Sequence, residues 1–213
     1  LNFNNCKFVS NKAGTGNTHY GGAVCGSSTG NVGTAVFNNC EFTSNSSAKG
    51  GVVYAESGVW SFTDCTVKNN SSTGASGAFH MEADTEVSIS GGSFETNTAV
   101  SDGGAMRVAS KSFVADDVDF IGNKGAQTTA GNSQGGAIYF ANNESGSERT
   151  VSNCLFKENT VDASCAPNPG SLAEGEDESF VRGGAIYIQS KSPDVTFTSC
   201  TFELNKQLNV TTY

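Results

Sequence analysis

The sequence predicts an all-β protein that folds as a right-handed parallel β-helix, with about seven coils and about three short strands in each coil. Three observations support this prediction. An aromatic-x-x-Asn tetrapeptide recurs along the chain, a Gly-Gly-Ala-apolar tetrapeptide alternates with it, and uninterrupted copies are spaced 25 to 27 residues apart. Such self-similarity is typical of a stacked solenoid, in which each repeat forms one coil. Connections between parallel strands are almost always right-handed, which gives the expected hand.

The repeat runs from Phe8 to Asn205, so we expect residues 1–213 to form one domain, a solenoid of the pectin-lyase-like type. Because the sequence begins and ends within a repeat, we expect it to be a fragment of a longer solenoid.

Each aromatic tetrapeptide is expected to be a short strand whose aromatic side chain points inward and whose Asn marks the strand end. Stacked coils would place the aromatic residues in one internal column and the asparagines in a ladder that bonds across coils. A seventh, degenerate copy carries Val67 and Asn70. The six full copies carry Phe8 and Asn11, Phe42 and Asn45, Phe94 and Asn97, Phe120 and Asn123, Phe156 and Asn159, and Phe202 and Asn205.

A second strand precedes each aromatic tetrapeptide. Alternating apolar residues predict a strand there, and an Asn or Asp that breaks the alternation predicts a corner in the left-handed conformation. The leading apolar residues are Phe3, Phe37, Phe62, Ile89, Val151 and Phe197, with Ala115 in the deviating copy. The corner residues are Asn5, Asn39, Asp64, Asp117 and Asn153.

The Gly-Gly-Ala segment predicts the third strand of each coil. Its second glycine is Gly22, Gly51, Gly104, Gly136 and Gly184, and a degenerate copy reads Ser76-Gly77-Ala78-Phe79. Alternation places apolar residues on the inner face of this strand. The outer face would then carry a column that we expect to be an exposed contact surface: Cys25, Tyr54, His80, Arg107, Tyr139 and Tyr187.

Insertions vary more than the tetrapeptides. Between the aromatic residue and the next Gly-Gly, the shortest copies need 8 or 9 residues, but the copies starting at Phe8, Phe120 and Phe156 need 13, 15 and 27. The large insertions therefore leave from one corner, and we expect that corner to be a binding face. The longest insertion covers residues 160–182, and another lies near Thr128.

Composition argues against several function classes. The net charge is −9 and the twelve Lys and Arg residues are scattered, so we expect no nucleic-acid partner. No apolar run is long enough to span a bilayer, so we expect no direct membrane insertion of this chain. No motif for a metal ion or a cofactor is present, and we expect neither.

The cysteines leave alternatives open. Cys6, Cys40, Cys65, Cys154 and Cys200 occupy one inward position of the repeat, where a small polarizable side chain packs well. Adjacent coils would also allow a disulfide from Cys40 to Cys6 or to Cys65. Cys25 is expected to face outward, and an odd total of seven leaves one thiol unpaired within the chain.

Catalysis is the weaker interpretation, and we expect a protein without catalytic residues. The one plausible acid pair, Glu56 and Glu82, lies beside the outer column. The acidic stretches 116–119 and 174–178 lack the spacing of a calcium loop. Five acceptor sequences begin at Asn45, Asn69, Asn70, Asn143 and Asn209. If the chain passes through a eukaryotic secretory pathway, we expect N-glycosylation at Asn45, Asn70, Asn143 and Asn209.

The alternating Phe-x-x-Asn and Gly-Gly-Ala-[Ile/Leu/Val] tetrapeptides resemble the repeats of the chlamydial polymorphic outer membrane proteins. That resemblance implies a β-helical autotransporter passenger, an adhesin on the outer membrane surface that binds receptors on host cells or matrix, with the tetrapeptides themselves implicated in adhesion. Similar repeats occur in secreted proteins of eukaryotic microbes, which leaves open an extracellular rod or filament glycoprotein built from copies of itself. A carbohydrate-active β-helix enzyme is the third alternative.

Overall fold

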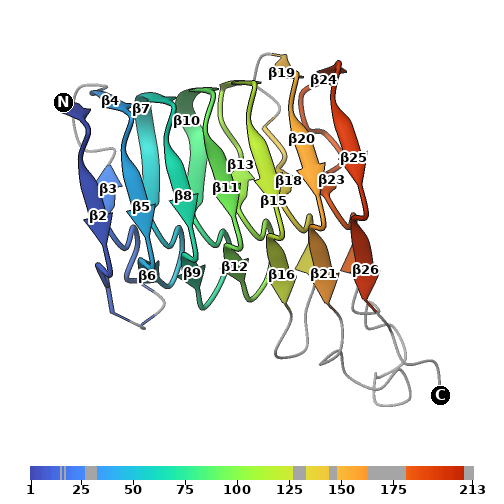
Figure 1. The fold of residues 1–213 in the computed structure, drawn as a ribbon, viewed down its shortest axis with the longest axis horizontal. Coiled ribbons are helices and arrows are strands. Elements are labelled where there is room, and N and C mark those ends of the chain that lie inside the picture. Colours follow the sequence, from blue (N-terminus) through green and yellow to red (C-terminus); the bar gives the residue numbers. More distant parts are fainter. Residues whose placement is uncertain are drawn as a thin grey trace.

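The computed structural model describes residues 1–14, 16, 18–26, 33–126, 133–143, 148–162 and 181–208. Every regular element in these ranges is a β-strand, and all the strand pairs are parallel. The strands stack side by side along one axis, so that the chain advances from one end of a rod to the other (Figure 1). The predicted parallel β-helix is therefore confirmed.

The aromatic tetrapeptides form a seven-stranded sheet, here called the aromatic sheet, with one strand for each coil. Its register pairs Phe8 with Phe42 and continues through every aromatic position to Phe202. The prediction of seven coils is thus confirmed. In spatial order the strands are β2 (Lys7–Val9), β5 (Glu41–Thr43), β8 (Thr66–Lys68), β11 (Ser93–Glu95), β15 (Asp119–Ile121), β20 (Leu155–Lys157) and β25 (Thr201–Glu203).

The strands before and after this sheet in each coil belong to one eleven-stranded sheet, because β7 and β10 run through both. The leading strands are β1 (Asn2–Asn4), β4 (Thr34–Asn38), β7 (Val53–Thr63), β10 (Phe79–Ser90), β14 (Ser112–Asp116), β19 (Arg149–Ser152) and β24 (Val195–Thr198). The remaining Gly-Gly-Ala strands are β3 (Val24–Gly26), β13 (Met106–Val108), β18 (Ile138–Phe140) and β23 (Ile186–Ile188).

A third sheet of very short strands follows the asparagines, and the sequence did not predict it. Each strand has two or three residues, too few for an alternation to be visible. This corner sheet contains β6 (Ser46–Ser47), β9 (Ser71–Ser72), β12 (Thr98–Ala99), β16 (Lys124–Ala126), β21 (Thr160–Asp162) and β26 (Lys206–Leu208). A separate pair joins β17 (Ser133–Gln134) to β22 (Val181–Arg182).

The interior holds the predicted aromatic column. Ring centroids of Phe8 and Phe42 lie 4.8 Å apart, and those of Phe120 and Phe156 also lie 4.8 Å apart with nearly parallel planes. Where Val67 interrupts the column, the ring of Phe79 from β10 contacts Phe94 edge-on at 4.9 Å. Each fully buried aromatic contributes roughly 1.5 to 3 kcal/mol, so the column is a main source of stability.

The asparagines of the tetrapeptides form the predicted ladder, and it is buried. In the middle of the chain, both the backbone N–H and the side-chain Nδ2 of Asn70 donate to Asn97 Oδ1, at 3.0 and 2.9 Å. Asn70 Nδ2 also donates to the carbonyl oxygen of Phe42. The side chain of each Asn therefore satisfies a backbone N–H and a backbone carbonyl oxygen of the preceding coil, as Asn70 does for the Asn45 N–H and the Phe42 carbonyl oxygen.

The two glycines of the Gly-Gly-Ala motif have different physical roles. The first has a positive φ, as in Gly50 (62°) and Gly103 (68°). The second lies where a coil passes directly over the next, so that a Cβ on Gly104 would overlap the carbonyl oxygen of Gly136. The first role favours glycine, because another side chain would be strained there, and the second requires it, because a side chain has no space.

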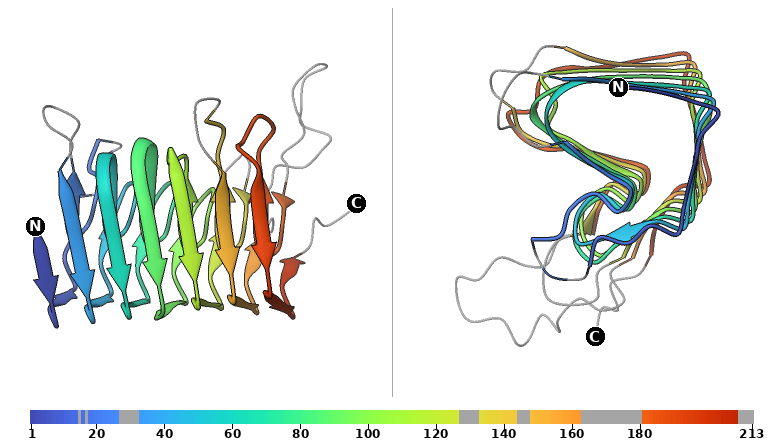
Figure 2. Two further views of the ribbon diagram at one scale, coloured as in Figure 1. Left: turned by 90° about the horizontal axis from the view of Figure 1, so that it is seen from above. Right: turned by 90° about the vertical axis from the view of Figure 1, so that its left-hand side faces the viewer.

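Viewed along its axis, the solenoid has a cross-section that is indented on one side (Figure 2, right). Chain excursions leave the coil at two edges. The expected edge lies between the aromatic sheet and the Gly-Gly-Ala strand, where the ends of the predicted 160–182 insertion form strands β21 and β22. Residues 163–180 and 127–132 of that edge lie outside the described residues.

The prediction that all large insertions share one corner is wrong. A second edge separates each Gly-Gly-Ala strand from the leading strand of the next coil. Within β7 the Gly-Gly-Ala strand continues directly into the leading strand. In other coils a connection lies between these two strands: residues 27–33 separate β3 from β4, and residues 141–148 separate β18 from β19. The prediction rested on the number of residues between each aromatic residue and the next Gly-Gly. That number does not include the connections at the second edge.

Arg149 breaks the inward apolar pattern of the leading strands. It pairs with Phe113 and Val195 in the core-facing column, yet it is completely buried. Its Nη1 donates to the carbonyl oxygen of Ala141 at 2.9 Å and to Ser192 Oγ at 2.7 Å. Burial lowers its pKa to about 10. The cation thus joins loops of neighbouring coils at the second edge.

Candidate functional site

The outer column of the Gly-Gly-Ala strands is in register across six coils, as predicted. Its side chains stack: Tyr54 and His80 have centroids 5.2 Å apart, and Tyr139 and Tyr187 have centroids 5.4 Å apart. The guanidinium carbon of Arg107 lies 6.0 Å from the Tyr139 ring, which adds a cation–π contact. Tyr20, from the first insertion, stacks on Tyr54 at 4.4 Å.

The prediction that this column is an exposed contact surface is wrong for half of it. Tyr54 and Tyr139 are each 6% exposed and His80 is 2% exposed, while Arg107 and Tyr187 are partly buried. Stacking on neighbouring rings and on the Arg107 guanidinium covers the faces of the rings. Alternation predicts which face a side chain occupies, but it does not predict whether that face is covered.

A polar network surrounds His80. Ser76 Oγ lies 3.0 Å from His80 Nδ1, and Glu82 Oε1 lies 3.0 Å from His80 Nε2. Arg107 Nη1 donates to the other oxygen of Glu82 at 3.2 Å. Because a carboxylate only accepts, neutral His80 donates from Nε2 to Glu82 and accepts from the Ser76 hydroxyl at Nδ1. Ser76, His80, Glu82, Arg107 and the nearby Asp102 are called the Arg107 cluster below.

The charges of this cluster perturb its titrations. The hydrogen bond from His80, with the charge of Arg107, lowers the pKa of Glu82 to about 2. Burial lowers the pKa of His80. Burial also raises the pKa of Asp102 to about 6, and its Oδ1 is a buried atom without a hydrogen-bond partner among the described residues. Burial raises the pKa of Tyr139 to about 12, with a contribution from Asp102.

Ser76, His80 and Glu82 contain the residue types of a nucleophilic triad, but their geometry does not suit one. Ser76 is fully buried, so its hydroxyl has no path to a substrate. The backbone N–H groups of Gly77 and Ala78, which would have to stabilise an oxyanion, donate to carbonyl oxygens of the next coil. The hydrogen bonds instead stabilise Ser76 at a φ of 68°, where the other copies have glycine.

The Glu56 and Glu82 pair gains no support as an acid–base pair. A glycosidase acid must hold a proton near neutral pH. Glu82 has a pKa of about 2 and is bonded to both His80 and Arg107, so it is an ionised structural group. Within the described ranges, no group of three or more His, Cys, Asp and Glu side chains is placed to hold a metal ion.

The cysteines are free thiols wherever the structure describes them, and Cys165 lies outside the described residues. Cys65 Sγ donates to the carbonyl oxygen of Phe37, and burial raises the pKa of this thiol to about 11. Cys154 behaves in the same way, with a pKa of about 12. These two thiols therefore pack as core side chains, and among the cysteines that the structure describes Cys25 alone is exposed.

Three of the predicted glycosylation sites do not suit a glycan in the folded chain. Asn45 and Asn70 belong to the buried ladder, with exposures of 0% and 1%. Asn143 Nδ2 donates to the carbonyl oxygens of Ala83 and Ala109 at 3.1 and 2.8 Å. A sugar on any of these nitrogens would displace those hydrogen bonds. Asn209 lies outside the described residues, as does the acidic stretch 174–178.

The acidic stretch 116–119 is used within the structure. Asp116 Oδ1 accepts hydrogen bonds from Ser152 Oγ at 2.6 Å and from Asn153 Nδ2 at 2.8 Å. These bonds join two coils at the corner where Asp117 and Asn153 have positive φ. The predicted absence of a calcium loop remains a prediction.

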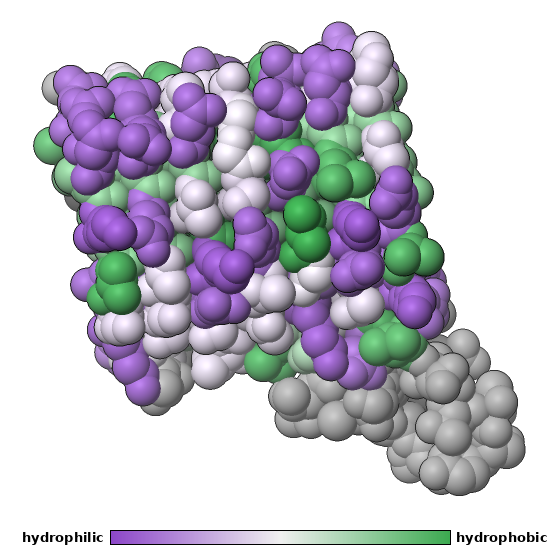
Figure 3. Space-filling view, in the orientation of Figure 1, coloured by the Kyte–Doolittle hydropathy of each residue, from purple (hydrophilic) through white to green (hydrophobic). Residues whose placement is uncertain are grey.

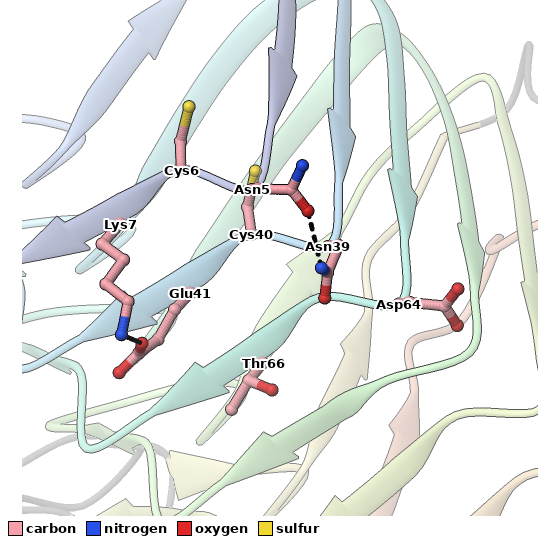
Figure 4. A pocket seen from close by; sticks show the side chains of 8 residues that line it. All are labelled: Asn5, Cys6, Lys7, Asn39, Cys40, Glu41, Asp64 and Thr66. Carbon is pink, nitrogen blue, oxygen red and sulfur yellow. Dashed lines mark hydrogen bonds and ion pairs between the residues drawn. The ribbon is translucent and has the colours of Figure 1, made fainter.

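A small polar pocket of about 320 Å³ lies on the first three coils, at the corner before the aromatic sheet (Figure 4). Asn39 Nδ2 donates to Asn5 Oδ1 at 2.7 Å, and Lys7 pairs with Glu41 at 2.7 Å. Asp64 points away from both pairs in this view (Figure 4). Because its polar groups bond one another and do not converge, the pocket has no ligand-binding arrangement.

The outer surface of the aromatic sheet is mixed and mostly polar (Figure 3). Ion pairs join neighbouring strands there, including Lys68 to Glu95 at 2.7 Å and Lys157 to Glu203 at 3.8 Å. Exposed pairs of this kind contribute little stability. Val9 of β2 is a large apolar side chain exposed on this sheet.

Sequence and structure together define a class, a parallel β-solenoid whose repeat motifs lie in its interior. Comparison with protein families gives the particular family: the model for the right handed beta helix region matches residues 22–212. The chain therefore belongs to the right-handed β-helix family. Comparisons with curated proteins and with solved structures found no match. No helix that could cross a membrane occurs in the described ranges.

Sequence reasoning missed three features of this region: Asp102, the bond between Ser76 and His80, and the buried Arg149. Two of them carried a signal. Ser76 is the one serine among the first positions of the Gly-Gly-Ala motif, and Arg149 occupies a core-facing position two residues before Val151. Asp102 carried none, because its burial depends on neighbouring coils.

Proposed function

We propose that this protein is an extracellular or cell-surface binding protein of the adhesin type, and that it acts without catalysis. The observation that carries the proposal is the burial of the repeat motifs. Phe42, Asn45 and Gly51 are all inside the coil, so a receptor cannot read the tetrapeptides on the folded protein. Contacts to a partner must then come from the parts that vary between coils.

The two edges are the surfaces where neighbouring coils differ most. The strands of the aromatic sheet repeat with the same length and register in every coil, whereas the connections at both edges change in length. Solenoids commonly use such variable connections for recognition, supported by the rigid stack of strands. The partner expected from the resemblance is a receptor on a host cell or in the matrix, bound at the bacterial outer membrane surface.

Binding of the 213-residue chain to host cells or matrix proteins, measured by flow cytometry and surface plasmon resonance, tests this proposal. One variant joins Asp162 to Val181 through a short Gly-Ser linker, and a second shortens residues 127–132. The matched control is Thr43→Ala on the regular aromatic sheet. We expect the edge variants to bind at least about tenfold more weakly, with an unchanged β-type circular dichroism spectrum.

Unchanged binding by both edge variants would refute the assignment to this edge. Absence of binding by the parent chain would refute the adhesin proposal itself.

A structural rod or filament is the second candidate function. It is favoured by the uniform register of the aromatic sheet, whose strands pair in parallel in every coil, because a second copy of the same repeat could continue such a stack. Ordered self-association in analytical ultracentrifugation and electron microscopy supports this function, and a strictly monomeric native protein argues against it.

A further inference from the structure

Two titratable groups of the Arg107 cluster, His80 and Asp102, respond to acidification in opposite ways. His80 lies in β10, between Tyr54 of β7 and Arg107 of β13, and it is almost completely buried. Asp102 precedes β13, and one of its oxygens is buried without a hydrogen-bond partner among the described residues. A buried imidazole beside a cation resists a second positive charge, whereas a partly buried carboxylate with one unpaired oxygen takes up a proton more readily than a solvated one.

We propose that acidification protonates Asp102 of the Arg107 cluster while His80 stays neutral. The hydrogen bonds of His80 with Ser76 and Glu82 are then kept from neutral to mildly acidic pH.

The groups facing His80 support its resistance to protonation. Arg107 Nη1 lies 3.5 Å from His80 Nε2, and Lys49 adds a second positive charge from the corner before β7. Burial is the largest cause of the lowered pKa of His80, and these two cations lower it further. Glu82 opposes them through its hydrogen bond to Nε2. Tyr54 stacks on the ring, and Ser76 bonds its other nitrogen.

The groups facing Asp102 support early uptake of a proton. Burial raises its pKa from 3.8 to about 6, and the charge of Arg107 offsets this in part. Tyr139 of β18 lies close enough for Asp102 to raise the pKa of its phenol. The backbone carbonyl of Asp102 accepts from the Ser76 N–H at 2.9 Å. Asp102 and His80 are therefore linked both through Ser76 and through Arg107.

The two groups change stability in opposite directions. The folded pKa of Asp102 is raised, so its stabilising contribution is complete below pH 3.8 and is lost as the pH rises through about 6. The folded pKa of His80 is lowered from 6.5, so its contribution is complete above that pH and is lost as the pH falls. Between about pH 4 and 6.5 the two effects oppose each other.

The test compares urea unfolding of the 213-residue chain with Asp102→Asn, His80→Gln and the double variant, at pH 5.0, 6.0 and 7.5. Dividing the unfolding constant of each variant by that of the parent chain removes the pH dependence that other carboxylates contribute to both. We expect the unfolding constant of Asp102→Asn, relative to the parent, to fall about tenfold from pH 5.0 to 7.5. For His80→Gln the same ratio should change in the opposite direction, falling as the pH decreases.

A ratio that does not change with pH for either single variant would overturn the proposal. Should a variant fail to fold, NMR titration of the parent chain gives an independent answer. We expect the Asp102 carboxyl to titrate near pH 6. We expect the His80 imidazole to change from neutral to charged below pH 6.5. An Asp102 midpoint near 4, or a His80 midpoint above 6.5, would overturn the proposal.

Discussion

Two columns of planar side chains run along the solenoid, one inside the coil and one on its indented side. Both have the spacing of neighbouring strands: 4.8 Å between Phe8 and Phe42 inside, and 5.2 Å between Tyr54 and His80 outside. The inner column repeats Phe in six of its seven positions. The outer column carries four residue types in its six positions.

The difference shows that stacking geometry alone does not dictate the residue. Inside, every position has the same apolar surroundings, so one residue type suits nearly all of them. Outside, each residue is fitted to its own neighbours, as His80 is to Ser76, Glu82 and Arg107. The inner column therefore builds the fold, and the variable outer parts are where properties specific to this protein are found.

Gly104→Ala should have the largest effect, because it disturbs the corner that holds both columns in place. The new methyl group would overlap the carbonyl oxygen of Gly136, which belongs to the backbone and cannot move aside. We expect a loss of about 4 kcal/mol or more in the free energy of unfolding, or failure to fold. Gly33→Ala is the control, since no atom lies within 4 Å of its added Cβ.

Urea unfolding measures both glycine variants. Similar stability of Gly104→Ala and Gly33→Ala would contradict the close backbone contact between coils.

Asn97→Ala should have the next largest effect. It removes the acceptor for two N–H groups of Asn70 and the donor to the Val67 carbonyl oxygen. Each buried group left unpaired costs about 1 to 3 kcal/mol, so we expect a loss of about 3 to 5 kcal/mol. Asn38→Ala removes a single exposed bond to Asn4 and should cost less than about 1 kcal/mol. Equal losses in the two variants would argue against a buried ladder.

Two substitutions of Ser76 separate backbone strain from hydrogen bonding in the outer column. Ser76→Gly relieves the positive φ while it loses the bond to His80, so stability should change by less than about 1 kcal/mol. Ser76→Ala keeps the strain and loses the bond, and should cost about 2 kcal/mol. Thermal and urea unfolding compare the pair. An alanine variant as stable as the glycine variant would show that φ at this position carries no strain.

Thr96→Asn should have the smallest effect, and it should be stabilising. Thr96 has a φ of 51°, which a β-branched residue rarely adopts and which Asn tolerates. The exposed hydrogen bond from Thr96 Oγ1 to Asn69 offsets part of the gain. We expect an increase of about 0.5 to 1 kcal/mol in the free energy of unfolding. A decrease would mean that the lost hydrogen bond exceeds the relief of strain.

The inner column and its corner residues could be predicted from the sequence. Phe42 and Asn45 recur at a fixed distance, and Asn39 interrupts the alternation at a corner, where its φ is 50°. Such signals are local, and the stacking of identical coils multiplies them. Strands of two residues, such as Ser71–Ser72, are too short to leave a pattern.

The outer half could be predicted only in part. Alternation predicted that Tyr54 and Tyr139 lie on the outer face. It did not predict their burial, because the side chains that stack on them come from neighbouring coils and from the first insertion. Asp102 is partly buried, and the tertiary contacts that bury its Oδ1 leave no trace in the local sequence. The replacement of glycine by Ser76 was the visible signal, since an exception within a regular motif points to a compensating partner.

Hydrogen exchange of the asparagine ladder tests the central claim, that the repeat motifs are internal, most directly. NMR of the 213-residue chain would follow the backbone N–H and the side-chain amide protons of Asn70, Asn97 and Asn123, with the partly exposed Asn38 side chain as reference. We predict exchange at least about a thousandfold slower for the ladder amides than for Asn38. Exchange of the ladder amides as fast as that of Asn38 would place the motifs at the surface and contradict this claim.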